Sequence, residues 1–139
     1  MGVINEDALW TAKVFGACGA VKLLGEPLYR YIARDGSITN NFNPKVMDVF
    51  DNCRELEDFI VSRYPSIEDS CACYCARAVW NIVLASSRGG NIRSYPEVHR
   101  RAMYELSERR TAVAKYCNSP KELILRLLVK TGIYGLLRR

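Results

Sequence analysis

Residues 44–63, PKVMDVFDNCRELEDFIVSR, give the clearest prediction of the fold of this chain. Pro44 suits the first turn of a helix, because the N–H group it lacks would have no partner there in any case. Apolar side chains then recur at helical spacing and form one stripe: Val46, Val49, Phe50, Cys53, Leu56, Phe59 and Ile60. The pattern predicts an amphipathic helix that ends before Tyr64-Pro65.

Two further helices are expected after this break. Ser66 is a candidate cap for a helix over about residues 67–87, and Ser94 for one over about 95–117. Residues 86–91, SSRGGN, form the loop between them. The expected core positions of the two helices are Ile67, Cys71, Tyr74, Val79, Ile82, Val83, Val98, Met103, Leu106, Val113 and Tyr116.

The C-terminal residues 119–139 begin with Ser119-Pro120-Lys121-Glu122, a capping-box pattern. A leucine-rich segment with five basic residues and one acidic residue follows over 120–139. Such a composition is typical of a helix that lies on an anionic membrane surface, although the basic residues do not share one helical face. Docking on another protein domain explains the same pattern equally well.

The net charge of +5 is unevenly distributed along the 139 residues. Residues 1–88 carry 9 Lys/Arg and 11 Asp/Glu, whereas residues 89–139 carry 11 and 4. The basic part indicates either an anionic partner or a solvated helical face. We expect no nucleic-acid partner, because the basic residues are not interleaved with aromatic residues on a binding platform.

The cysteines and the apolar runs indicate a cytoplasmic protein. No run approaches the ~18 apolar residues of a membrane-spanning helix, and the acidic first ten residues do not resemble a signal peptide. Cys71, Cys73 and Cys75 lie within a helical pattern, where Cys71 and Cys75 share a face and Cys73 does not. We therefore interpret the six cysteines as reduced thiols rather than as metal ligands.

The N-terminal residues carry the most varied chemistry. Asn5 is a candidate cap for a helix over about residues 6–18, and Glu6 and Asp7 then fall in its first turn. Acidic residues are favourable there because of the helix dipole, so the pair needs no catalytic role. Taken alone, the local pattern favours this structural explanation over an acid–base pair.

Two short β-prone runs follow, at residues 20–24 and 27–33, and Gly25-Glu26-Pro27 separates them. Arg34-Asp35-Gly36-Ser37 is then expected to turn the chain. Arg34 and Ser37 are suited to bind phosphate, or else only to stabilise the turn. The expected fold is mainly α (α+β), a bundle of about four to five helices with a short two-stranded β element near the N-terminus.

A resemblance to a known family lies in two stretches of the sequence. The first is Asn5-Glu6-Asp7-x-x-Trp10 with the apolar run after it, and the second is Glu26-Pro27-Leu28-Tyr29-Arg30-Tyr31-x-x-Arg34-x-Gly36-Ser37-Ile38-Thr39. The segment over about residues 4–40 is similar to the final catalytic portion of bacterial family 2 glycosyltransferases of the capsule and exopolysaccharide kind. These enzymes have a GT-A fold, use a nucleotide-sugar donor with a divalent metal, and invert the anomeric configuration. The resemblance implies polysaccharide biosynthesis with a glycan or lipid-linked acceptor.

The resemblance also implies roles for individual residues. Asp7 would be the catalytic base and Glu6 its neighbour, whereas Trp10, Tyr31, Arg34 and Ser37 would bind substrate. Inverting transfer needs one carboxylate to deprotonate the acceptor hydroxyl. The leaving diphosphate needs cationic groups such as Arg34.

The chain departs from the family pattern in one respect, since it contains no Asp-x-Asp metal motif. We therefore expect no cofactor in this chain, and Mg²⁺ or Mn²⁺ in the parent enzyme. Residues 1–43 would end a GT-A catalytic domain, residues 44–118 would form a helical C-terminal domain, and residues 119–139 a basic leucine-rich helix. Such a C-terminal fragment would be inactive alone, and would lie in the cytoplasm or at the inner face of the cell membrane. The alternative is a stand-alone helical module that binds an acidic protein or a membrane surface.

Overall fold

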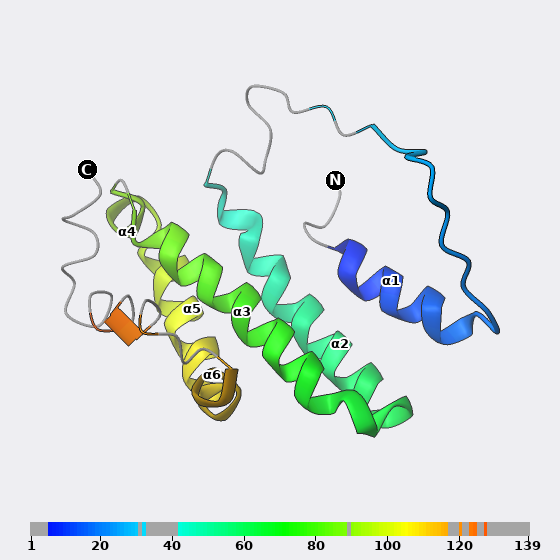
Figure 1. The fold of residues 1–139 in the computed structure, drawn as a ribbon. Coiled ribbons are helices and arrows are strands. Elements are labelled where there is room, and N and C mark those ends of the chain that lie inside the picture. Colours follow the sequence, from blue (N-terminus) through cyan, green and yellow to red (C-terminus); the bar gives the residue numbers. More distant parts are fainter. Residues whose placement is uncertain are drawn as a thin grey trace.

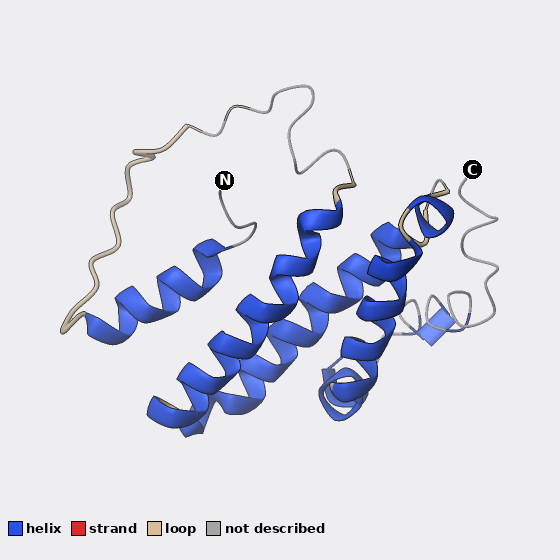
Figure 2. Cartoon of the chain, turned by 180° about the vertical axis from the view of Figure 1, so that it is seen from behind, coloured by secondary structure: helices blue, strands red, loops and turns tan. Residues whose placement is uncertain are grey.

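A computed structural model of the chain describes residues 6–30, 32, 42–88, 90–116, 120, 123, 124 and 127. Over this part of the chain the fold is helical (Figures 1 and 2). The elements are α1 (Glu6–Ala17), η1 (Pro44–Met47), α2 (Asp48–Arg63), η2 (Pro65–Ile67), α3 (Glu68–Ser86), α4 (Asn91–Ser94), α5 (Pro96–Glu108) and α6 (Arg110–Tyr116), of which η1 and η2 are short 3-10 helices.

Helix α3 occupies the centre of the bundle. It runs antiparallel beside α2, and α5 and α6 pack against it as well (Figure 1). The turn between α2 and α3 falls at Tyr64, whose backbone leaves the helical region (φ −138°, ψ 55°) just before Pro65. This confirms the expected break, since a residue before proline avoids the α conformation.

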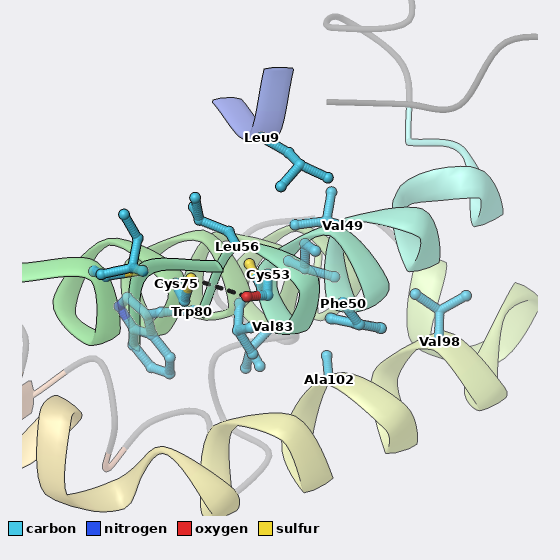
Figure 3. Packing of buried hydrophobic residues seen from close by; sticks show 14 residues of the cluster. Leu9, Val49, Phe50, Cys53, Leu56, Cys75, Trp80, Val83, Val98 and Ala102 are labelled. Atoms are coloured by element: carbon cyan, nitrogen blue, oxygen red, sulfur yellow. Dashed lines mark hydrogen bonds between the residues drawn. The ribbon is translucent and has the colours of Figure 1, made fainter. Parts of the chain in front are cut away.

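The core lies where α2, α3 and α5 face one another (Figure 3). On α2 the buried residues Val49, Cys53, Leu56 and Ile60 follow the predicted stripe. On α3 four of the six expected core residues are buried: Cys71, Val79, Ile82 and Val83. Cys75 is buried as well, whereas the expected Ile67 and Tyr74 are exposed. Ile67 is exposed because it lies in η2, before α3 begins.

The predicted two-stranded β element is wrong over the residues that the structure describes. Residues 20–30 form no strand and are all exposed. An alternating pattern stabilises a strand only when one face is buried and a neighbouring strand accepts its hydrogen bonds, and an isolated hairpin is marginal in water. Gly25 and Pro27 weaken such pairing further, because glycine lacks a side chain to pack and proline lacks the donor. Residues 31 and 33 of the second run lie outside the described part.

Several predicted helix boundaries also need correction. The segment 95–117 is two helices rather than one, because the backbone turns at Arg109 (φ −95°, ψ 20°). Ser66 and Ser94 cap nothing: α3 starts after Ile67 and α5 after Tyr95, without a side-chain capping bond. Gly90, with φ of +83°, lies in the expected loop and directly precedes the short α4, which occupies most of the stretch between this loop and the expected helix start.

At the N-terminal end of the bundle, the predicted position of Pro44 in the first turn of a helix is confirmed. Pro44 occupies the first turn of η1, and the Oδ1 atom of Asn43 accepts a hydrogen bond of 3.0 Å from the N–H of Lys45. This satisfies one of the donors that a helix start leaves free. The ring of Phe42 lies 5.6 Å from that of Tyr95, which links this start to the beginning of α5.

Helix α1 lies on the opposite side of α2 from α3 (Figure 1). Leu9 is its buried residue and joins the main core. The hydroxyl of Tyr64 donates a 3.0 Å hydrogen bond to the carbonyl oxygen of Gly16, and Lys13 pairs with Glu55. These contacts hold the middle and the C-terminal end of α1 on α2.

No helix in the described part of the chain is long and apolar enough to cross a membrane. Residues 120, 123, 124 and 127 are helical, and the rest of the predicted helix 119–139 lies outside the described residues.

Candidate functional site

Glu6 and Asp7 form the first turn of α1, and both side chains are exposed. The Oδ1 atom of Asp7 accepts a 2.9 Å hydrogen bond from the N–H of Ala8, which is one of the free donors of the helix start. The structure thus bears out the helix-start position of the pair. It also leaves both carboxylates open to solvent, as an acid–base pair requires.

Trp10 lies one turn further along α1 and is 65% exposed. Residues three and four apart on a helix are neighbours, so Trp10 shares a face with Glu6 and Asp7. The structure therefore brings three of the six predicted site residues together on one helix. Tyr31, Arg34 and Ser37 lie outside the described residues, and their position relative to Asp7 remains a prediction.

The segment after α1 is an extended arm, residues 18–30, that stands away from the helical body (Figures 1 and 2). It exposes large apolar side chains, with Leu23 92% and Tyr29 82% exposed. Val21, Leu24 and Leu28 are exposed as well. Clustered exposed apolar residues are typical of a surface that another structure covers.

A second group of functional interest was not foreseen from the sequence. Glu105 on α5 is only 1% exposed, yet it pairs with three arginines, Arg54, Arg101 and Arg109. The Nε atom of Arg101 lies 2.7 Å from Oε1 of Glu105, and Nη1 of Arg109 lies 2.8 Å from Oε2. Arg109 also makes a bidentate pair with Glu57 on α2, with distances of 2.7 and 3.0 Å.

This network joins α2 to the junction of α5 and α6. Burial alone would lower the pKa of the Arg109 guanidinium, but its hydrogen bonds to Glu57 and Glu105 raise that pKa above the ordinary value. Arg109 therefore stays charged in the core. Arg101, Glu105 and Arg109 are spaced four residues apart, so the sequence alone indicates that their charges can pair along one face of a helix. It does not indicate that Glu105 and Arg109 are buried, because burial depends on how the helices pack.

A cavity of about 430 Å³ opens beside the network, between α2, α3, α5 and α6. Its walls combine charged groups with apolar ones. The lining residues that matter for its chemistry are Arg54, Glu57, Cys71, Tyr104, Glu105 and Arg109. The size suits a small molecule, and the site lies in the helical body, away from α1.

Ser86 and His99 form a further polar pair, at the contact between α3 and α5. The Oγ atom of Ser86 lies 2.9 Å from Nδ1 of His99 and 3.0 Å from the carbonyl oxygen of Val83. Burial lowers the pKa of His99 below its ordinary value of 6.5. Since Ser86 is fully buried, the pair links α3 to α5 and does not present a nucleophile to solvent.

Cysteines 18, 53, 71, 73 and 75 are free thiols. Among the described residues no group of three His, Cys, Asp or Glu side chains is arranged to hold a metal ion.

Comparisons with known proteins place the chain in no family: no family model, no curated protein and no solved structure matches it.

Proposed function

We propose that this chain provides the acceptor side of an inverting, nucleotide-sugar-dependent glycosyltransferase of family 2. The observation that carries the proposal is the exposed pair at the head of α1, where the Asp7 carboxylate is open to solvent beside Glu6 and Trp10. The sequence around this pair, and the Tyr29–Ser37 segment after it, resemble the family pattern.

In the proposed reaction Asp7 takes the proton of the acceptor hydroxyl as its oxygen attacks the anomeric carbon of the donor. The bond between that carbon and the diphosphate oxygen breaks, and the nucleotide diphosphate leaves from the opposite face. Arg34 and Ser37 bind the diphosphate, with Arg34 supplying positive charge. No step involves a metal held by the described residues.

Trp10 is proposed to bind the acceptor sugar next to the base. An exposed tryptophan on the face of Asp7 offers a flat apolar surface for a sugar ring, together with one N–H donor. This arrangement requires only α1, which the contacts of Leu9 and Tyr64 hold in place.

The exposed arm supports the same proposal. Leu23, Leu28 and Tyr29 have no cover in the helical body, although large apolar side chains are favourably buried. We propose that they pack on the nucleotide-binding half of the enzyme, which would carry the Asp-x-Asp motif that this chain lacks.

The experiment that tests this proposal compares two proteins. One is this chain alone; the other includes any nucleotide-binding region encoded in frame before Met1. Each is incubated with a panel of nucleotide sugars and Mn²⁺, and free nucleotide diphosphate is measured. We expect release only from the longer protein. A stop codon just before Met1, or turnover by this chain alone, would contradict the proposal.

The alternative, a helical interaction module, has one observation in its favour. Leu123, Ile124 and Leu127 are at least half exposed and lie on one helical face within the basic C-terminal part. Co-sedimentation with anionic phospholipid vesicles, with and without residues 119–139, distinguishes the two cases. Binding that needs residues 119–139 and weakens with salt would favour a membrane-surface module.

A further inference from the structure

The cavity in the helical body has no role in the proposed transferase reaction. Its volume is about 430 Å³, and it lies between α2, α3, α5 and α6. Helix α1, which carries Glu6, Asp7 and Trp10, packs on the opposite side of α2 from α3 (Figure 1). A cavity of this size is large enough for a small organic molecule. The charges and the apolar groups of its walls indicate which class of molecule fits.

The most buried charged groups of the cavity are already paired. Arg109 uses all three nitrogen atoms of its guanidinium group: Nε and Nη2 bond Glu57 at 3.0 and 2.7 Å, and Nη1 bonds Oε2 of Glu105 at 2.8 Å. Arg54 pairs with Glu105 as well, and its Nη1 atom lies 3.8 Å from the carboxylate of Asp51. The two arginines that line the cavity are therefore poorly placed to bind an anionic ligand.

Two further carboxylates, Glu68 and Glu108, line the cavity without such compensation. Glu68 belongs to the first turn of α3, Glu108 is the last residue of α5, and both residues are exposed. Within the described part of the chain neither carboxylate forms an ion pair. Because both are exposed, they lie at the opening of the cavity rather than at its buried end. The opening therefore carries negative charge that attracts a cationic group.

Aromatic and apolar groups complete the walls. Tyr104 lines the cavity and is 55% exposed, so a ligand can reach its ring from solvent. The face of an aromatic ring attracts ammonium and guanidinium groups. The apolar part of the lining is formed by Val61, Cys71, Ala72 and Ala112. A ligand that matches both parts has a cationic end and an apolar body.

We propose that the cavity binds a small organic amine. Its protonated nitrogen lies at the opening, beside Glu68, Glu108 and the ring of Tyr104, and its apolar part fills the space between the helices. The apolar walls and the aromatic ring favour an organic cation over a bare Ca²⁺ or Mg²⁺ ion, which prefers oxygen ligands. The proposal does not depend on the glycosyltransferase function.

The test uses three probes of similar size that differ in charge: phenethylamine, phenethyl alcohol and hydrocinnamate. The amine carries its proton at neutral pH, as the lysine side chain does. Each probe is titrated into the isotopically labelled 139-residue chain, and the amide chemical shifts are followed by NMR. At millimolar concentrations we expect saturable shifts at the lining residues with the amine, weaker binding of the alcohol and the weakest binding of the carboxylate. Added salt should reduce these differences, because the opening is exposed.

Substitutions then test the two carboxylates. Glu68→Gln and Glu108→Gln should each weaken binding of the amine by about two- to fivefold, the range expected for exposed ion pairs, and leave binding of the alcohol unchanged. Glu97→Gln is the matched control. It removes the same charge from an exposed position in the first turn of α5, and Glu97 does not line the cavity. This variant should bind the amine as the unmodified chain does.

The aromatic contribution is tested at Tyr104. Tyr104→Leu should weaken binding of the amine more than binding of the alcohol, whereas Tyr104→Phe keeps the ring and should preserve the difference. The comparison of the three probes on the unmodified chain needs no variant, so it decides the question even if a substitution impairs folding. Equal affinities for amine and alcohol, shifts confined to residues outside the cavity, or no saturable shifts with the amine would overturn the proposal. So would an effect of Glu97→Gln as large as that of Glu68→Gln.

Discussion

Glu105 lies at the centre of the buried charge network, because its carboxylate pairs with three arginines. Its carboxylate is almost completely buried. The negative charge is compensated by Arg101 on α5, by Arg109 directly after α5 and by Arg54 on α2. Removing one partner of a buried ion pair is costly, because the charges left behind remain desolvated. Arg109 is the residue most affected, since it is itself buried.

We therefore expect Glu105→Gln to lower the free energy of unfolding by about 3–5 kcal/mol. Urea denaturation followed by circular dichroism measures the change. Glu108→Gln is the matched control: it removes the same charge one position before Arg109, but from an exposed side chain, so a change within about 0.5 kcal/mol is expected. Similar values for the two variants would show that the network contributes nothing to stability.

A second prediction concerns His99 and the pH dependence of stability. Because burial lowers its pKa in the folded chain, the unfolded chain binds a proton first as the pH falls. The contribution of neutral His99 to the free energy of unfolding is complete at pH values above 6.5, the ordinary pKa of histidine. This contribution is lost as the pH falls towards the lower pKa that His99 has in the folded chain. The loss is about 1.4 kcal/mol for each unit by which the two pKa values differ.

The measurement compares unfolding free energies at pH 7.5 and 5.5 for the unmodified chain and for His99→Asn. Asparagine keeps a polar group near Ser86 but does not titrate. We expect the variant to lose less stability on acidification. An equal loss in both proteins would assign the pH dependence to other groups.

The packing of α1 against α2 depends on Gly16. A Cβ atom at this position would lie 3.0 Å from the hydroxyl oxygen of Tyr64 and 3.1 Å from Cζ of Phe59. The two helices thus approach closely where the Tyr64 hydroxyl bonds the Gly16 carbonyl. Glycine is unfavourable within a helix, but at position 16 its lack of a side chain lets α1 pack closely on Phe59 and Tyr64.

Gly16→Val should displace these rings and loosen α1, at a cost of about 1–3 kcal/mol. Amide hydrogen exchange measures the effect locally: protection along α1 should fall, while that of α3 stays. Gly19→Val is the control, because nothing lies within 4 Å of the Cβ position at Gly19. Unchanged protection of α1 in Gly16→Val would contradict the packing described.

The helices could be predicted from sequence far better than the segment between α1 and η1. On α2 the apolar stripe, Pro44 and the Tyr64-Pro65 break all act locally, so they determine the element without reference to distant residues. Residues 20–30 have strand-like alternation, but a strand needs a partner, and within the described chain they have none. Arg109, where α5 ends, pairs with Glu57, which lies far away in sequence, so the surroundings of this break are not visible in the local pattern.

At the scale of the whole molecule, the chain has two parts with different surfaces. The helical body buries its own core, whereas α1 presents Glu6, Asp7 and Trp10 outward and continues into an exposed apolar arm (Figure 1). Sequence could predict that Glu6 and Asp7 start a helix, because capping and the helix dipole are local effects. It could not predict the Glu105 network, which joins α2 to α5 and to Arg109 at the end of α5, or the cavity, which lies between four helices.

In the proposed reaction Asp7 acts as a base and not only as a helix-start charge. Helix α3 provides the matched comparison, because Glu68 and Asp69 form the same acidic pair in its first turn. Asp7→Asn and Asp69→Asn therefore remove the same charge from the same helical position.

The deciding measurement is kcat for sugar transfer by the complete enzyme, with each of these two substitutions. We predict that Asp7→Asn lowers kcat by about 10²–10⁴-fold, the usual contribution of a general base, while Asp69→Asn leaves it unchanged. Equal kcat values for the two variants would contradict the role of Asp7 as the catalytic base.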